Sequence, residues 1–182
     1  FDVESRPNKW GGGYCTEFPK FRQPFILANF NGTSGDVDVV THEAGHALNA
    51  YLIADNRFAL ELGCGGMETA ETHSMSMEFF AWPYLDGFFP KAGDAERYRY
   101  QHALDALSFL PYGAMVDEFQ HRVYAEPDLT PAGRNAVWLE LEAKYRPYID
   151  QRGIPYLERG TRWQYQMHIY ETPFYYIDYC LA

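Results

Sequence analysis

The sequence predicts a mainly helical fold with a small β-sheet near the N-terminus. Apolar residues recur at helical spacing over most of the chain after residue 34. The only segments with strand character lie before that point, and prolines separate the helical segments. The 182 residues can bury one sizeable core, and no linker divides them. We therefore expect a single domain over residues 1–182.

Two segments form the predicted sheet. The Gly-rich stretch 10–16 (WGGGYCT) precedes the apolar run 24–30 (PFILANF), which ends at the turn signal Asn31-Gly32. We expect these segments to pair. The glycines are typical of a tight turn, or of a strand that a ligand backbone approaches closely. Both interpretations stay open on the residues alone.

The first two helices follow the sheet. Ser34-Gly-Asp36 offers a helix start, and apolar residues then recur at i, i+3 and i+4 until about Ala54. A glycine-containing loop leads to the second predicted helix, residues 67–82, which Pro83 stops.

Further helices are predicted in the remaining chain. Pro111 and Pro127 end two of them, and Thr130 followed by Pro131 is a cap with proline at the first helical position. The aromatic tail is expected to be helical with a break at Pro173. The predicted ranges are 94–110, 112–124, 131–145 and 163–181.

Composition excludes several classes of protein. Hydrophobic residues make up 47% and aromatic residues 18% of the chain, which argues against disorder. A net charge of -10 argues against a nucleic-acid partner, which needs a basic surface. No stretch has the ~20 apolar residues that a membrane span needs. Three cysteines without metal-type spacing indicate free thiols, so we expect a cytoplasmic protein.

The segment Thr41–Ala47 (THEAGHA) lies within the first predicted helix. His42 and His46, four residues apart, stand on one helix face, so both imidazoles can reach one tetrahedral zinc at ~2.0–2.1 Å. Glu43 can reach a zinc-bound water, where a general base is needed. Gly45 costs a helix ~1 kcal/mol relative to alanine, which indicates a special requirement there. The pattern predicts a metal site.

A catalytic zinc needs a third protein ligand. No further histidine follows on the same helix, so acidic residues beyond it, or His73, are the candidates. The acidic candidates are Glu61, Glu68, Glu71 and Glu78. Glu71 and Glu78, seven residues apart, share one face of the second helix. One of them can bind the metal while the other orients an imidazole.

An ordered set of segments resembles the oligoendopeptidase F branch of the thimet oligopeptidase family. The set spans nearly all of the chain, which makes it more specific than any single motif. Its members are Gly12–Thr16, Pro24–Phe30, Thr41–Ala47, Glu71–Glu78, His168–Tyr170 and Pro173–Tyr179.

The resemblance implies a helical zinc-peptidase catalytic core, an endopeptidase that cuts short peptides in a channel between two mostly helical halves. It implies one zinc per chain, held by His42, His46 and Glu71, with Glu43 as the general base. For Glu78, which matches a second acidic position, we expect a role in orienting a ligand.

The resemblance also assigns a role to the C-terminal cluster. His168, Tyr176 and Tyr179 are expected to stabilise the oxyanion of the reaction, with Tyr175 as the alternate tyrosine. A peptide is expected to add as a strand along residues 11–14. His102, in contrast, shows no obvious partner and is expected to be an ordinary surface or core residue.

Members of this family are several hundred residues long, so we expect the chain to be part of a larger catalytic domain. Other segments of the same polypeptide would then complete the channel. The first alternative is a catalytically incomplete zinc-containing module that binds peptides. The second is a coincidental HExxH motif in a helical interaction domain, which would bind no stoichiometric metal. An aminopeptidase would need an acidic anchor for the substrate amine, which the sequence does not locate.

Overall fold

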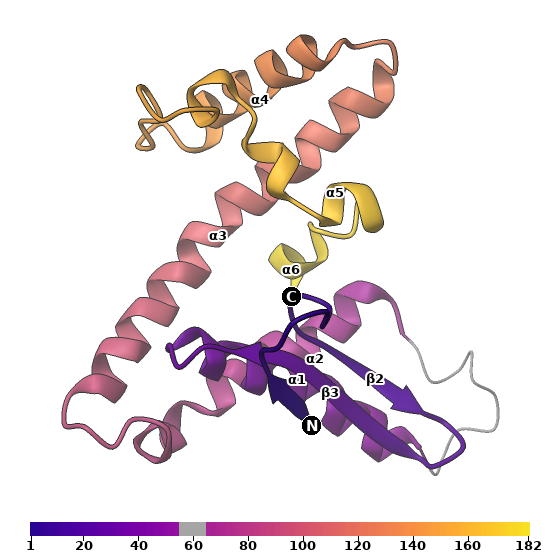
Figure 1. Ribbon diagram of the computed structural model, residues 1–182, viewed down its shortest axis with the longest axis vertical. Coiled ribbons are helices and arrows are strands. Elements are labelled where there is room, and N and C mark those ends of the chain that lie inside the picture. Colours follow the sequence, from indigo (N-terminus) through magenta and orange to yellow (C-terminus); the bar gives the residue numbers. More distant parts are fainter. Residues whose placement is uncertain (55–64) are drawn as a thin grey trace. The chain divides into compact units, whose positions relative to one another are not determined.

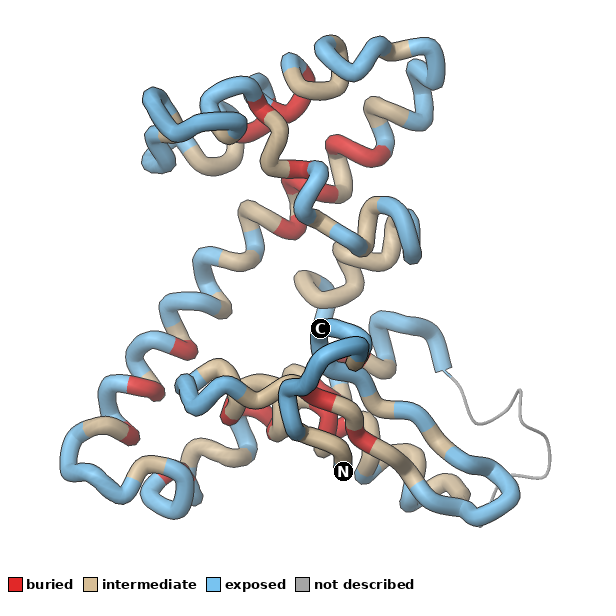
Figure 2. The backbone as a smooth tube through the Cα atoms, in the orientation of Figure 1, coloured by how far each residue is buried: buried red, intermediate tan, exposed pale blue. Residues whose placement is uncertain are grey.

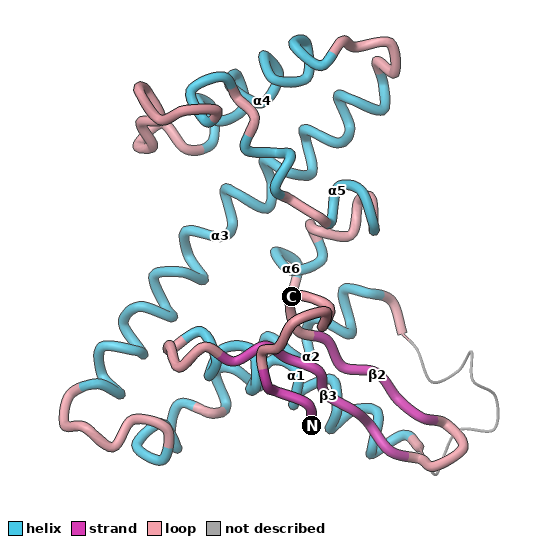
Figure 3. The backbone as a smooth tube through the Cα atoms, in the orientation of Figure 1, coloured by secondary structure: helices cyan, strands magenta, loops and turns pink. Residues whose placement is uncertain are grey.

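The computed structural model describes residues 1–54 and 65–182. These residues form two compact units, 1–102 and 103–181. Helix α3, Asp94–Ala125, begins in the first unit and continues into the second. Helices predominate outside the small N-terminal sheet, as the sequence predicts (Figure 3). The single domain over residues 1–182 stays a prediction, since one catalytic domain can comprise two such units.

The sheet has three strands in the order β1-β3-β2 (Figure 1). Strand β2, Tyr14–Phe18, pairs antiparallel with β3, Gln23–Phe30, which confirms the predicted pairing. Strand β1, Asp2–Glu4, pairs parallel with β3 and was not predicted. Three residues are too few to show an alternating pattern, and a parallel pairing leaves no local turn signal.

Helix α1, Gly35–Ile53, packs against β2 and β3 and also against α2, Met67–Phe80. Its start is fixed by Asp36, whose carboxylate accepts hydrogen bonds from the backbone amides of Asn31 and Gly32. Ser34 makes no side-chain cap bond. A carboxylate in the first turn also suits the helix dipole. The helix is thereby tied directly to the end of β3.

Helix α2 ends just before Pro83, as predicted, and the chain continues as the 3-10 helix η2, Trp82–Gly87. The buried residues of the first unit lie where β3, α1, α2 and the start of α3 meet (Figure 2). One hydrophobic cluster of this unit comprises Val37, Leu85, Ala95 and Tyr98.

The predicted break at Pro111 is wrong, because α3 is one continuous helix with Pro111 inside it. Proline removes one backbone N–H, which leaves only the carbonyl of Leu107 without its helical partner. Leu107 is an exposed residue, so water can reach this part of the helix. The turns that follow are held by burial of Met115 and Phe119. Packing on one side and solvation on the other therefore outweigh the cost of the proline.

The second unit contains the rest of α3, then α4, Pro131–Tyr145, and short helical turns after it. The Thr130 hydroxyl accepts a hydrogen bond from the backbone amide of Gly133 at 3.1 Å, so the predicted cap is present. The turns are η3, Leu157–Arg159; η4, Arg162–Tyr165; α5, His168–Glu171; and α6, Asp178–Leu181. The aromatic tail is thus helical only in single turns.

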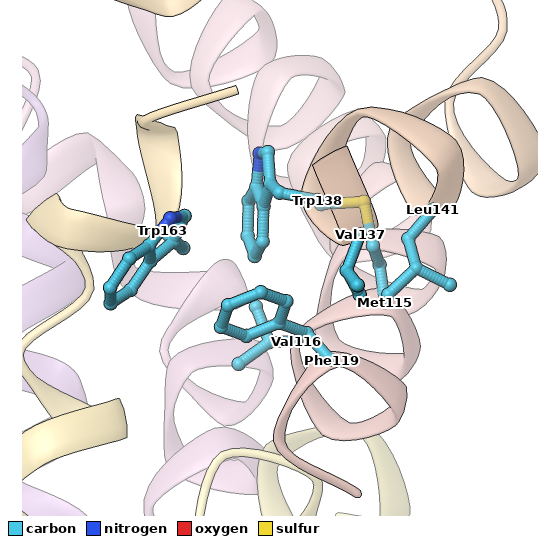
Figure 4. Close-up of a cluster of buried hydrophobic side chains, with 7 residues drawn as sticks. All are labelled: Met115, Val116, Phe119, Val137, Trp138, Leu141 and Trp163. Carbon is cyan, nitrogen blue, oxygen red and sulfur yellow. The ribbon is translucent and has the colours of Figure 1, made fainter. Parts of the chain in front are cut away.

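The core of the second unit joins α3 to α4 and the segment after it (Figure 4). Its members are Met115, Val116, Phe119, Val137, Trp138, Leu141 and Trp163. Aromatic edges meet faces within it: the rings of Phe119 and Trp138 are 5.1 Å apart at 84°. None of the helices within the described residues is long and apolar enough to cross a membrane.

Candidate metal centre

Helix α1 carries His42 and His46 on one face, with ring centroids 5.1 Å apart. Spacing of i and i+4 brings the two side chains to neighbouring positions on the helix surface. Both imidazoles are mostly covered, with 18% and 22% of their side chains exposed. The helix therefore presents two nitrogen ligand atoms side by side, and both are largely shielded from solvent.

Helix α2 supplies a carboxylate opposite these histidines. Glu71 Oε2 lies 3.2 Å from His42 Nε2 and 3.7 Å from His46 Nε2. The Glu71 side chain is buried, and the Ser74 hydroxyl donates to the same oxygen at 2.7 Å. A hydroxyl one turn along the helix thus holds the carboxylate in place.

Gly45 allows α1 and α2 to approach closely enough for this arrangement. A Cβ atom at this position would lie 2.5 Å from the carbonyl oxygen of His73 and 2.7 Å from Cα of Ser74. Real Cβ atoms essentially never come that close. The helical cost of glycine noted in the sequence is therefore offset by helix contact.

The three side chains fit a metal ion. Two donors at ~2.0–2.1 Å from a tetrahedral zinc lie about 3.3 Å apart, close to the two nitrogen–oxygen separations seen here. One ligand atom from each of His42, His46 and Glu71 lies within 4.8 Å of the others. Within residues 1–54 and 65–182, no other group of histidine, cysteine and acidic side chains meets this criterion. Two nitrogens and one oxygen are a donor set that suits zinc.

The other candidates for the third ligand have different settings. Glu68 is exposed at the start of α2. His73 lines a groove together with Leu48, Leu52 and Phe80. Glu61 lies outside the described residues.

Glu78 contacts His42 from the side away from Glu71. Its Oε1 atom lies 2.7 Å from His42 Nδ1, so a proton on Nδ1 directs the Nε2 lone pair towards Glu71. Burial lowers the pKa of His42, but hydrogen bonds to Glu71 and Glu78 outweigh this effect and raise it to about 9. For Glu78 the effects have the opposite signs. Burial raises the pKa of this carboxyl, but hydrogen bonds from His102 and His42 outweigh burial and lower it. The two acidic residues therefore hold His42 between them.

Glu43 points to the sheet side of α1. Its side chain is buried, and Oε2 has no hydrogen-bond partner among the described residues. Burial raises the pKa of Glu43 to about 7, against the opposing effect of the charge on His42. A Cβ atom at Gly13, just before β2, would lie 3.7 Å from Glu43 Oε1. The carboxylate thus stands beside the residue that precedes β2, with a proton affinity suited to acid–base chemistry.

His168, Tyr176 and Tyr179 gather in the second unit. The ring centroids of His168 and Tyr176 are 4.8 Å apart, and the Tyr179 hydroxyl lies 3.5 Å from His168 Nε2. The Gln166 amide lies 2.8 Å from His168 Nδ1. The Tyr175 ring stacks on His168 at 6.0 Å. Burial raises the pKa of Tyr176, so its hydroxyl stays protonated and can donate.

The structure thus brings the predicted site residues together as two groups, one in each unit. Sequence reasoning missed His102, which is buried and hydrogen-bonded to Glu78 at 2.7 Å. His102 and Glu78 are 24 residues apart in the sequence, so no local pattern indicates that they are in contact. The helical spacing of Ala95, Tyr98 and His102 indicates a shared buried face, but not which polar partner lies there.

An HExxH helix facing a glutamate from the next helix, in a mainly helical fold, is typical of the metallopeptidase class. The sequence model of peptidase family M3 matches residues 1–181, and the chain belongs to this family.

Solved structures agree with this assignment. Pz peptidase A with an inhibitor and a protein designated oligoendopeptidase F each show 52% identity and a TM-score of 0.94. A protein from Bacillus anthracis strain Ames with the same designation shows 44% identity and a TM-score of 0.80. The match covers 98% of this chain but only 31%, 31% and 28% of those chains. The comparison with curated proteins gives no match.

Proposed function

We propose that the chain is the catalytic core of a zinc-dependent endopeptidase that hydrolyses short peptides. The observation that carries this proposal is the convergence of His42, His46 and Glu71 beside the buried carboxylate of Glu43. Membership of peptidase family M3 supports peptide-bond hydrolysis as the reaction class. Because the chain spans less than a third of the matched relatives, the whole protein's activity belongs to this proposal.

His42, His46 and Glu71 would hold one zinc ion per chain. When bound, the zinc supplies Lewis acidity, which lowers the pKa of a coordinated water and polarises a carbonyl. Glu71 is held by Ser74, and His42 by Glu78, so both ligands are oriented before a metal arrives. Preorganised ligands of this kind favour a tight site.

Glu43 acts as the general base and then as the general acid. It takes the proton of the attacking water while the scissile carbonyl becomes tetrahedral, and it gives that proton to the leaving amine. Its burial beside Gly13 and its Oε2 atom without a described partner support this role. A pKa of about 7 suits a group that must both accept and release a proton.

His168, Tyr176 and Tyr179 are proposed to stabilise the oxyanion, with Tyr175 as the alternate. Support comes from their chemistry: hydroxyl and imidazole donors are grouped within one unit and held by contacts with Gln166 and with each other. Losing one donor of this kind typically lowers the rate by about 10²–10³-fold.

The substrate is proposed to add as a strand along the outer edge of β2 and the residues before it. In the described sheet, β2 lies at an edge, with its other side paired to β3. An added strand gains affinity from main-chain hydrogen bonds, largely without regard to side chains. Gly13→Pro should therefore raise KM, whereas a Tyr14 substitution should leave it unchanged.

A reducing, cytoplasmic setting is part of the proposal. Cys15 and Cys180 are free thiols, which supports such a compartment, while Cys64 lies outside the described residues. The second candidate function is a catalytically incomplete zinc-containing module that binds peptides, favoured by the 31% coverage of the matched relatives.

Zinc stoichiometry and cleavage of a quenched fluorescent peptide, measured on wild type and Glu43→Gln, separate these functions. One zinc per chain in both proteins with cleavage only by wild type supports the peptidase with Glu43 as base. Zinc in both without cleavage by either favours the binding module. The absence of zinc from wild type would refute the metal site.

A further inference from the structure

Both ring nitrogens of His102 have hydrogen-bond partners in the first unit. Its Nδ1 atom lies 2.9 Å from the indole Nε1 of Trp82, and its Nε2 atom lies 2.7 Å from Glu78 Oε2. His102 is 7% exposed, so water does not compete for either bond. Its ring therefore joins Trp82, at the start of η2, to Glu78 on α2.

Trp82 and Glu78 together determine which nitrogen of His102 carries the proton. An indole N–H is a donor only, so His102 Nδ1 must accept through its lone pair. The single proton of the neutral ring then sits on Nε2 and points at Glu78 Oε2. Without this indole, Nδ1 would lose its donor, and Glu78 alone would favour the proton on Nε2.

Glu78 is consequently bound at both of its oxygens. Oε2 accepts from His102, and Oε1 lies 2.7 Å from Nδ1 of His42. A carboxylate with each oxygen committed to a different imidazole has a fixed plane. Trp82 and His102 thereby reach His42 through Glu78, whose Oε1 atom is bonded to the His42 ring.

Packing holds the His102 ring in this orientation. The ring of Tyr98 stacks on it at 5.6 Å with an angle of 11°, and the Phe79 ring lies 4.7 Å away. The Tyr98 hydroxyl in turn donates to Asp38 on α1, one turn before His42. The start of α3 is thereby bonded to the same helix that carries the histidines.

We propose that Trp82 and His102 are positioning residues that act through Glu78 to orient His42 for metal binding. This inference rests on the proposed function, because it concerns the same metal site. An ordinary buried histidine needs only some donor and some acceptor. Here the hydrogen bonds converge on Glu78. The indole of Trp82 donates to His102, and His102 and His42 each donate to one oxygen of Glu78.

Zinc affinity, measured by competition with a chelator, tests the proposal on the whole chain. His102→Phe keeps a flat ring but removes the donor to Glu78, and the expected loss is about 10-fold, the lower end for a direct partner of a metal ligand, because His102 acts through Glu78. His102→Gln keeps an N–H at a similar distance along the side chain. It should bind zinc within about 3-fold of wild type, and thermal unfolding shows whether both variants fold.

The tautomer supplies a readout that needs no metal. Nitrogen-15 NMR of the metal-free chain should show His102 protonated at Nε2 only, and Trp82→Phe, which leaves Nδ1 without its donor, should weaken zinc binding. Trp163→Phe is the matched control, because it removes an indole bond to Asn135, also 2.9 Å long, in the second unit. It should leave zinc affinity unchanged.

The outcomes separate this proposal from the proposed function. Zinc bound equally well by wild type and His102→Phe would overturn the positioning role and leave the peptidase proposal intact. Protonation of His102 at Nδ1 would overturn it as well. A wild-type chain that takes up no zinc would overturn the proposed function, and the positioning role with it.

Discussion

Gly45→Ala tests how closely α1 and α2 must approach to build the proposed metal site. The added Cβ would lie 2.5 Å from the carbonyl oxygen of His73, whereas ordinary van der Waals contact begins at 3.4 Å. The obstacle is backbone, which cannot rotate away, so the helices must separate locally by about 0.9 Å, the difference between those two distances. Metal sites tolerate changes of only about 0.2 Å in ligand distance.

We therefore expect Gly45→Ala to weaken zinc binding by at least about 10-fold, similar to the loss of an outer partner of a ligand. The free energy of unfolding should change by a similar or smaller amount. Alanine gains ~1 kcal/mol of helix propensity, and overpacking costs about 1–3 kcal/mol, so the net change is about 0–2 kcal/mol destabilising. Chelator competition measures the first quantity and denaturant unfolding of the metal-free chain measures the second.

Gly87→Ala is the matched control, because an added Cβ there meets nothing within 4 Å. It should bind zinc as wild type does. A Gly45→Ala variant that is more stable than wild type and binds zinc equally well would show that helix propensity alone governs this position. The reasoning from close helix contact would then be wrong.

Three further predictions concern the second unit. Burial raises the pKa of Glu142 against the opposing charge of Arg146. The stability that the protonated carboxyl contributes is therefore fully present below the pKa of the unfolded chain, about 4.3, and is lost as the pH rises through the pKa of the folded chain. Glu142→Gln should therefore be more stable than wild type at pH 7 and equal to it near pH 3.5 in thermal unfolding. Phe119→Ala should lose about 3–5 kcal/mol in denaturant unfolding, whereas Leu107→Ala on the exposed face should change little. Thr130→Ala, which removes the cap bond of α4, should cost about 1 kcal/mol in the same assay, and no change would mean that the bond is not formed in solution.

Local patterns in the sequence predicted most of the fold. The spacing of apolar residues located α1, and the Thr130-Pro131 pair located the start of α4. The error at Pro111 arose because local rules count the lost hydrogen bond but not the burial of Met115 and Phe119 beyond it. Tertiary packing can keep a helix continuous where its local sequence favours an end.

Only part of the candidate site could be predicted from local patterns in the sequence. Helical geometry brings His42 and His46 together, but the choice of Glu71 over Glu78 came from the resemblance to a family. Seven-residue spacing places both carboxylates on one face and cannot say which one lies nearer to Nε2. The link from His102 to Glu78 depends on how α3 packs against α2, which no local pattern encodes.

The open edge of β2, where we propose that the substrate adds as a strand, has a consequence for handling the protein. Backbone groups that can pair with a substrate can equally pair with the β2 strand of a second copy, and such edges are starting points for aggregation. Solubility should then depend on whether that edge is covered. A concentrated solution of the chain is expected to scatter less light when a slowly cleaved peptide is present, because ligand and self-association compete for one row of amides and carbonyls.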